Sequence, residues 1–148
     1  MFGENPIIGQ SMQKMDEKGR IILPKYTHAE PGDKIALMYD LKRTKIIIFK
    51  LMEFEQKLEE IGKKIDELYR NKQITYDERL WFQRYIYGDG CLEPPDTIGK
   101  GRRIVIPSRA VKKLNLRNEV FVIGNETRLE VYPSEEAYTM SLKRKENV

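Results

Sequence analysis

The chain has 148 residues, of which 40% are apolar and 34% are charged, and its formal net charge is +4. This composition is typical of a globular protein of one domain, or of two very small ones, and it excludes a disordered chain. No apolar run approaches the roughly 18 residues of a membrane span, and residues 1–10 lack the basic segment of a signal peptide, so we expect neither membrane insertion nor secretion.

A first motif lies near the start of the chain, where residues 16–24 read DEKGRIILP. A short polar, turn-rich segment follows at 25–34. Two runs of β-branched and aromatic residues come next, at 35–39 and 45–49, on either side of a turn around DLKRT. Such runs, bounded by turn residues, predict a β-hairpin. The acidic segment 51–56 then has the composition of a helix start.

Two helices are predicted after this hairpin. Apolar residues recur at steps of four and three, as on one face of an amphipathic helix: Phe54, Leu58, Ile61, Ile65 and Leu68. A capping box, Thr75-x-x-Glu78, predicts a second helix through the aromatic-rich segment 80–87. Gly88-Asp89-Gly90 and Pro94-Pro95 then interrupt the chain. The apolar stripe and Trp81 either bind a partner or cover the domain's own sheet, and covering the sheet is the commoner use.

A second copy of the motif follows this break, where residues 96–107 read DTIGKGRRIVIP. When the copies are aligned on their prolines, Arg20 matches Arg103. The turn-rich segment and the two apolar runs also recur, with the runs at 120–123 and 128–132. Ser134 then begins a second acidic, helix-like segment. Each copy therefore predicts a strand, a turn or short helix, and a hairpin.

The second copy contains an unusually basic block. Between Gly99 and Asn118 there are seven basic residues and no acid: Lys100, Arg102, Arg103, Arg109, Lys112, Lys113 and Arg117. Such a block either faces a polyanion or is a solvated surface that acids elsewhere balance, and charge alone leaves both interpretations open.

The repeat predicts how the chain is divided. We assign residues 7–54 to the first copy, 55–90 to a helical insert and 91–140 to the second copy. A few short strands cannot close a core alone, because one face and two edges stay open. We therefore expect the two copies to pair about a pseudo-twofold axis as one domain.

With the repeat recognised, the pattern Asp16-x-Lys18-Gly19-Arg20-Ile21-x-Leu23-Pro24 resembles the signature of the MraZ and AbrB-type transcription regulators. The chain is also similar to MraZ proteins in length, in its duplication and in its helical insert. The resemblance implies a mainly β fold with helices, namely a duplicated swapped-hairpin (double-split) β-barrel with a helical insert between the copies. It also implies sequence-specific binding of double-stranded DNA, ring-like homo-oligomers and a cytoplasmic, nucleoid-associated location.

The resemblance also indicates site residues. Arg20 and Arg103 match the motif arginine, and Lys18 matches the motif lysine. Lys112 stands where AbrB-type members carry a basic residue after the proline. The second loop contributes further basic residues next to its motif arginine. The predicted DNA-binding residues are Lys18, Arg20, Lys100, Arg102, Arg103 and Lys112.

The second copy departs from the family pattern. Two arginines, Arg102 and Arg103, follow its glycine where the first copy has only Arg20, so either of them is a candidate counterpart. Gly99 stands in place of the motif aspartate, and Asp96 lies three residues further upstream.

Arginine suits DNA recognition because its planar guanidinium makes paired hydrogen bonds to guanine or to phosphate. The alternative role for Arg20 is an ion pair with Asp16 that fixes the loop. The two roles can coexist.

Other classes of protein fit the sequence less well. The chain lacks GxxxxGK[ST], GxSxG and HExxH patterns, so we expect no enzyme and no cofactor. One cysteine, Cys91, and one histidine, His28, exclude an internal disulfide and a Cys/His zinc site, and they fit a reducing compartment. The alternative function is an AbrB-fold antitoxin or protein-interaction module that binds DNA only within a complex. The ten residues after Tyr138 are short for a toxin-binding tail.

Overall fold

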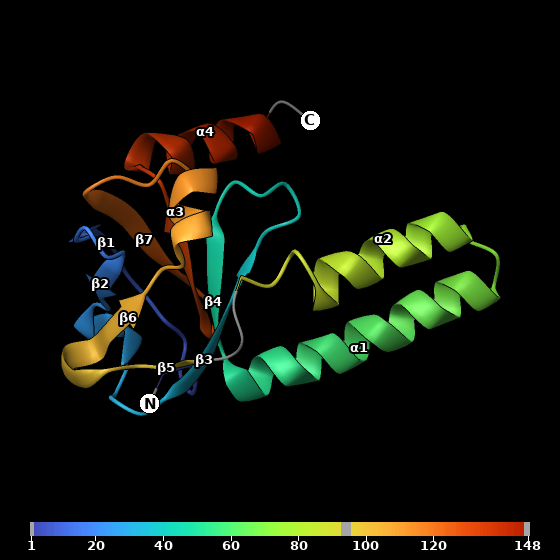
Figure 1. The fold of residues 1–148 in the computed structure, drawn as a ribbon, viewed down its shortest axis with the longest axis horizontal. Helices are drawn as coiled ribbons and strands as arrows, with labels where there is room; N and C mark the ends of the chain where they lie inside the picture. The colour runs from blue at the N-terminus through green and yellow to red at the C-terminus, as the bar shows by residue number, and fades with distance from the viewer. Residues whose placement is uncertain (1, 93–95, 147–148) are drawn as a thin grey trace.

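The computed structural model describes residues 2–92 and 96–146, so Pro94 and Pro95 lie outside the described residues (Figure 1). In chain order the elements are β1 (Gln10–Lys14), β2 (Arg20–Ile22), the 3₁₀ helix η1 (Lys25–Thr27), β3 (Lys34–Tyr39), β4 (Ile46–Lys50), α1 (Leu51–Arg70), α2 (Tyr76–Tyr87), β5 (Asp96–Thr97), the 3₁₀ helix η2 (Lys100–Arg102), β6 (Arg103–Val105), α3 (Ser108–Lys113), β7 (Glu119–Asn125), β8 (Arg128–Tyr132) and α4 (Glu135–Glu146).

The strands form two sheets. Six of them make one antiparallel sheet in the order β1-β7-β8-β4-β3-β5, and β2 pairs with β6 in a separate two-stranded ribbon. Strands β1, β3 and β4 come from the first copy of the motif, whereas β5, β7 and β8 come from the second. In this correspondence β1 matches β5, β3 matches β7 and β4 matches β8. Exchanging the copies therefore reverses the strand order and leaves the sheet unchanged. At the centre, β4 lies beside β8, with Ile47 opposite Glu130.

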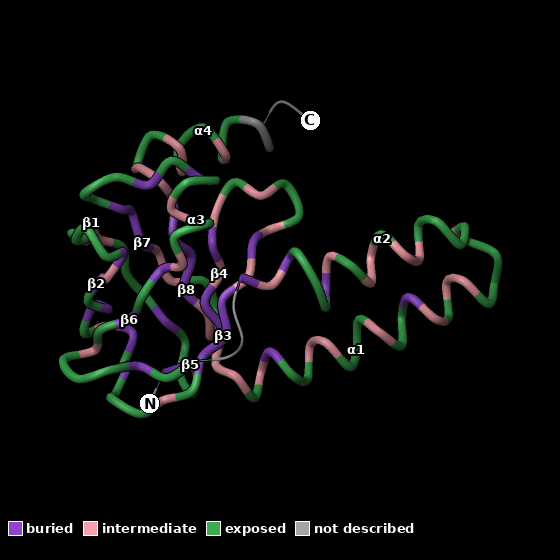
Figure 2. The backbone as a smooth tube through the Cα atoms, viewed as in Figure 1, coloured by how far each residue is buried: buried purple, intermediate pink, exposed green. Residues whose placement is uncertain are grey.

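The core lies between the six-stranded sheet and the ribbon. Alternate residues of the central strands are fully buried on the side facing the ribbon, because successive side chains of a strand point to opposite faces. These residues are Ile46, Ile48, Leu129 and Val131. Ile21 and Leu23 of the first motif, with Ile104 and Ile106 of the second, complete the same cluster. Figure 2 shows the buried residues concentrated in these strands.

Helices cover the opposite face of the large sheet. Phe54 in the first turn of α1 packs on Phe49 of β4, with ring centroids 5.8 Å apart. On the other half of the sheet, Tyr138 of α4 packs on Phe121 and Tyr132, with centroids 5.2 Å apart in both pairs. The first turn of α1 and the helix α4 therefore each pack on the hairpin that precedes them.

Helices α1 and α2 form an antiparallel hairpin that projects from the sheet (Figure 1). The predicted capping box is present, since Thr75 accepts a hydrogen bond from the backbone N–H of Glu78 and the Glu78 side chain accepts one in return. The apolar stripe of α1 reaches the sheet only near its first turns, and further along α1 packs against α2. Trp81 is 52% exposed on α2, so it is not buried against the sheet as the commoner of the two expected uses requires.

The mainly β character, both hairpins and the helical insert agree with the sequence analysis. The expected β-barrel does not close. The six-stranded sheet is open, with β1 and β5 at its edges, and the ribbon covers one face without joining it. Within the described residues, β1 pairs only with β7 and β5 only with β3, so no strand pairing links the two edges of the sheet.

Candidate nucleic-acid interface

The ribbon of β2 and β6 brings the two copies of the motif together. In its register Arg20 lies opposite Val105, Ile21 opposite Ile104 and Ile22 opposite Arg103. The middle pair is buried in the core. Because side chains alternate along a strand, the two outer pairs project from the other face. Arg20 and Arg103 thus lie diagonally across one surface of the ribbon.

The loop before β2 is organised by Asp16. Its Oδ1 accepts hydrogen bonds from the backbone N–H groups of Lys18, at 3.0 Å, and Arg20, at 2.9 Å. Its Oδ2 accepts a hydrogen bond from Nε of Arg20 at 2.6 Å. The backbone N–H of Arg20, followed by its guanidinium and the N–H of Lys18, holds the pKa of Asp16 below its ordinary value. The ion pair expected as an alternative role for Arg20 is therefore present.

This ion pair occupies only one edge of the Arg20 guanidinium. Within residues 2–92 and 96–146, no protein group hydrogen-bonds to the terminal Nη atoms of Arg20. An exposed ion pair of this kind adds little to stability, but it orients the side chain. Asp16 therefore holds Arg20 in place while its outer edge faces solvent.

The loop before β6 shares one backbone hydrogen bond with the first loop but lacks the carboxylate and contains a 3₁₀ turn, η2. Gly99 donates its N–H to the carbonyl oxygen of Arg103 at 2.8 Å, as Asp16 does to that of Arg20 at 3.1 Å. Because Gly99 has no side chain, it cannot give Arg103 the ion pair that Asp16 gives Arg20. The correspondence of backbone bonds makes Arg103 the positional counterpart of Arg20.

Arg102 instead occupies the position of Gly19. The carbonyl oxygen of Gly19 accepts the N–H of Ile106, and that of Arg102 accepts the N–H of Leu23, both at 2.8 Å. Both residues have positive φ angles, 78° for Gly19 and 60° for Arg102. Nε of Arg102 donates to the carbonyl oxygen of Leu23 at 2.9 Å, so this side chain ties the second loop to the first copy.

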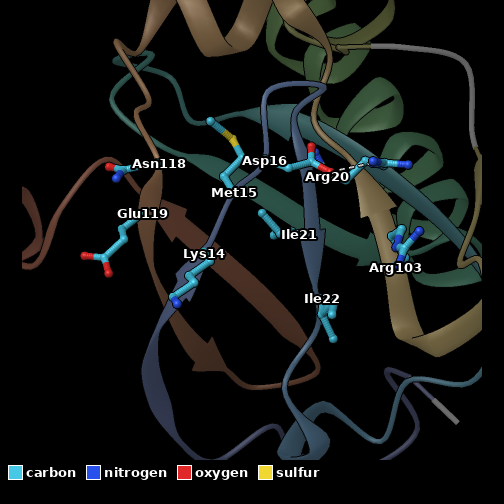
Figure 3. A pocket seen from close by; sticks show the side chains of 9 residues that line it. All are labelled: Lys14, Met15, Asp16, Arg20, Ile21, Ile22, Arg103, Asn118 and Glu119. Atoms are coloured by element: carbon cyan, nitrogen blue, oxygen red, sulfur yellow. Dashed lines mark hydrogen bonds and ion pairs between the residues drawn. The ribbon is translucent and has the colours of Figure 1, made fainter.

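Two neighbouring pockets open beside the motif. The ribbon pocket, of about 490 Å³, is lined by Lys14, Met15, Asp16, Arg20, Ile21, Ile22, Arg103, Asn118 and Glu119. Figure 3 shows Arg20 and Arg103 close together on one side of it, with Asn118 and Glu119 on the other. The lysine pocket, of about 500 Å³, includes Lys18, Lys112 and Arg117. The two pockets share Met15, Asp16 and Asn118, so they belong to one surface.

The predicted site residues divide between these pockets. Arg20 and Arg103 line the ribbon pocket, and Lys18 and Lys112 line the lysine pocket. Lys100 is exposed on η2, outside both pockets. The remaining predicted residue, Arg102, also lines neither.

Sequence reasoning missed four residues of this surface. Lys14 and Asn118 line the ribbon pocket, and Ile22 and Val105 share the outer face of the ribbon with the arginines. Lys14 is on a strand that no motif marks. Ile22 and Val105 could have been predicted, because each lies two residues after a motif arginine and strand alternation places such residues on the same face as that arginine.

The basic block of the second copy is not uniformly free for a ligand. Besides Arg102, Arg109 is tied to the backbone, since its Nη2 donates to the carbonyl oxygen of Cys91 at 2.7 Å. Lys112, Lys113 and Arg117 are exposed.

The described residues contain no cluster of acidic, histidine and cysteine side chains suited to a metal ion. None of their helices is long and apolar enough to span a bilayer.

Comparison with known proteins gives consistent relatives. The chain is 32% identical over 129 residues to the transcriptional regulator MraZ of Caldicellulosiruptor saccharolyticus, covering 87% of this chain and 82% of the relative. It is 32% identical over 127 residues to that of Halothermothrix orenii, covering 86% and 80%. To that of Paenarthrobacter aurescens it is 30% identical over 139 residues, covering 94% and 88%. No protein-family model matches the chain.

Proposed function

The chain belongs to the MraZ family of transcriptional regulators, and on this basis we propose that it binds double-stranded DNA sequence-specifically through the β2–β6 ribbon. The observation that carries the proposal is the placement of Arg20 and Arg103 on one exposed face of a ribbon whose other face is anchored in the core. The major groove of B-DNA is about 12 Å wide and admits a two-stranded β-ribbon. A ribbon fixed in this way places both arginines on the exposed face before DNA arrives, and Asp16 in addition orients the guanidinium of Arg20.

The two pockets have different roles in this proposal. The arginines of the ribbon pocket contact guanine edges, which provides specificity, because paired hydrogen bonds to O6 and N7 distinguish guanine from the other bases. Lys18, Lys112 and Arg117 of the lysine pocket contact phosphates, which provides affinity. Lys100 extends the phosphate contacts from the loop of the second copy.

The finer features of the fold are part of the same proposal. We assign residues 7–54 and 91–140 to two swapped-hairpin copies and residues 55–90 to the insert. The symmetric strand order, in which β1 pairs with the hairpin of the second copy and β5 with that of the first, supports this division.

The protein acts as a homo-oligomer, ring-like as in the family it resembles, on DNA in the cytoplasm at the nucleoid. One subunit offers only two motif arginines, and repeated subunits on repeated sites supply the remaining affinity.

Genomic DNA selection with the purified protein, followed by sequencing of the retained fragments, tests the proposal. We expect a recurring sequence element, and binding of that element should weaken steeply with salt. Three to four phosphate contacts per subunit predict a log–log slope of roughly −3 to −4 per subunit. Retention of no fragment at low salt, or a slope near zero, contradicts the proposal.

A further inference from the structure

Two apolar side chains occupy the outer face of the ribbon between the motif arginines. Ile22 is 48% exposed and Val105 is 51% exposed. They stand at opposite corners, with Ile22 paired across the strands with Arg103, and Val105 with Arg20. The ribbon therefore presents two arginines and two branched aliphatic groups on one surface.

This arrangement is repeated within the chain rather than accidental to one strand. The pair Arg20 and Ile22 on β2 corresponds to the pair Arg103 and Val105 on β6, and the two are related by the pseudo-twofold axis through the Ile21–Ile104 pair. Each copy thus places one branched aliphatic residue two positions after its arginine, on the same face.

We infer that Ile22 and Val105 are specificity-determining residues that contact the C5-methyl groups of thymines close to the guanines contacted by Arg20 and Arg103. This inference rests on the proposed DNA-binding function. In the major groove the thymine methyl group is the apolar feature that separates A·T from the other base pairs, and aliphatic side chains recognise it by contact. An arginine cannot detect this methyl group, because its guanidinium carries only hydrogen-bond donors.

The spacing of the strand matches the spacing of bases. Residues two apart on a strand lie roughly 6.6 Å apart, because the rise is about 3.3 Å per residue. Base pairs rise about 3.4 Å per step. Along β2, Arg20 and Ile22 therefore reach bases about two steps apart, and so do Arg103 and Val105 along β6.

The charges around these side chains favour DNA over another protein as the occupant. Each aliphatic group is flanked by arginines, and the adjacent pocket is lined by Lys14 as well as by Glu119 and by Asp16, which is paired with Arg20. Burying two guanidinium groups against an apolar protein surface would leave them without partners, which is costly. A major groove satisfies both chemistries at once, since it offers guanine acceptors and thymine methyl groups side by side.

The pseudo-twofold symmetry leads to a further expectation about the site. Duplex DNA has local twofold axes, so β2 and β6 approach its two strands in equivalent ways. The contacts are not identical, because valine is one methylene shorter than isoleucine. We therefore expect a quasi-palindromic pair of guanine and thymine contacts under each subunit, with unequal strength in its halves.

Replacing thymine by deoxyuridine tests the inference without changing the protein, because this removes only the C5-methyl group. Each thymine of the selected DNA element is replaced in turn, and the dissociation constant of the wild-type protein is measured. We expect about a fourfold loss of affinity at one or more positions, the equivalent of one buried methylene. At the remaining thymines we expect no change.

Protein variants then assign the sensitive positions. At one of the sensitive positions, the Ile22→Ser variant should bind DNA with thymine and DNA with deoxyuridine equally well, because the contact to the methyl group is already lost. The Val105→Ser variant should do the same at another position. Leu41→Ser is the matched control: Leu41 is 59% exposed in the turn between β3 and β4, away from the ribbon, and its removal should leave the deoxyuridine effect intact. Thermal melting establishes that each variant is folded.

The outcomes separate this inference from the proposed function. Salt-dependent, specific binding by the wild type with no sensitivity to deoxyuridine at any position overturns the inference and leaves the function standing. Failure to bind any selected DNA overturns both. If Ile22→Ser and Val105→Ser change the sedimenting mass and leave the deoxyuridine effect intact, the surface is a contact between subunits and the inference is wrong.

Discussion

At the residue scale, the difference between Asp16 and Gly99 makes the two motif arginines unequal. Nε of Arg20 lies 2.6 Å from the Asp16 carboxylate, which orients the side chain. In the second copy the position of Asp16 is occupied by Gly99, which has no carboxylate to orient Arg103. An oriented side chain loses less conformational freedom on binding than a mobile one. In the proposed function, Asp16 therefore acts as a positioning residue for Arg20 and does not itself touch DNA.

Alanine substitutions of the arginines test this assignment. Arg20→Ala and Arg103→Ala should each weaken specific binding by about 1–3 kcal/mol, because each removes a bidentate base contact. The melting temperature should change little, since both side chains are on the solvent face of the ribbon. Titration of the selected DNA element, together with thermal unfolding, measures both effects.

Two further variants distinguish a base contact from a loop anchor. Asp16→Ala should weaken binding less than Arg20→Ala, because the guanidinium remains. Lys113→Ala, on the exposed side of α3, should lower affinity for all DNA sequences alike and reduce the salt slope by about one. Equal damage from Asp16→Ala and Arg20→Ala, with a lowered melting temperature in both, would show that Arg20 acts by fixing its loop.

The equivalence of Gly19 and Arg102 gives a prediction for stability. Gly19 has a φ of +78°, and an added Cβ would lie 2.6 Å from the carbonyl oxygen of Ile106. Gly19→Ala should therefore destabilise the fold by about 1–3 kcal/mol. The reverse change, Arg102→Gly, relieves the left-handed backbone while losing the bond to Leu23, and its effect should stay within about 1 kcal/mol. Thermal or urea unfolding compares the two, and equal losses would contradict the equivalence.

At the element scale, the two hairpins are joined across β4 and β8 by a polar network. Nζ of Lys45 lies 2.6 Å from Oε1 of Glu130, and Asn125 and Tyr132 also donate hydrogen bonds to this carboxylate. Glu130 is only 7% exposed. Burial on its own raises the pKa of Glu130, but the hydrogen bonds from Lys45 and Asn125 outweigh it and hold that pKa below its ordinary value of 4.5.

This network predicts a pH dependence of stability. Because the folded pKa of Glu130 is lowered, its stabilising effect is fully present above pH 4.5 and is lost as the pH falls through the folded pKa. Glu130→Gln should remove this part of the acid dependence and cost about 1–3 kcal/mol near neutral pH, since Lys45 loses its charged partner. Urea unfolding between pH 3 and 7 measures both effects. Glu126→Gln is the control, because that carboxylate is 75% exposed and its loss should matter little.

The elements were predictable from sequence where the signal is local. The apolar runs gave β3, β4, β7 and β8, and the Thr75 capping box marked the start of α2. Long-range pairing was not predictable in the same way. Nothing near Lys45 in the sequence indicates Glu130, because their contact depends on the register of β4 against β8. Likewise, the exposure of Trp81 depends on how far the helical hairpin projects, which no local pattern encodes.

The candidate site shows the same division. The repeat located both arginines, and their meeting across the ribbon follows from the pairing of β2 with β6. The choice between Arg102 and Arg103 required the backbone bonds to Leu23 and Ile106, which join the two copies. Strand alternation was enough to place Ile22 and Val105 on the face of the motif arginines, but nothing in the sequence distinguishes them from other strand residues as candidate contacts.

At the scale of the whole molecule, the small area of the outer ribbon face predicts self-association. One subunit presents two arginines on its ribbon, and each good bidentate contact provides about 1–3 kcal/mol of discrimination. Specific binding generally exceeds non-specific binding by about 4–10 kcal/mol, so one subunit reaches at best the lower part of that range. Subunits held together and bound to repeated elements add their contacts with little further loss of translational freedom.

We therefore expect the protein to sediment as a multiple of its 17.5 kDa chain at micromolar concentration. DNA with one copy of the selected element should bind weakly, and DNA with two or more copies at a fixed spacing should bind at least tenfold more tightly, because the second contact is intramolecular. Changing that spacing by half a helical turn, about 5 base pairs, should abolish the gain, since the second ribbon then faces the wrong side of the duplex. A 17.5 kDa monomer that binds a single element as tightly as a repeated one would contradict the prediction. In that case the specificity has to come from contacts outside the ribbon.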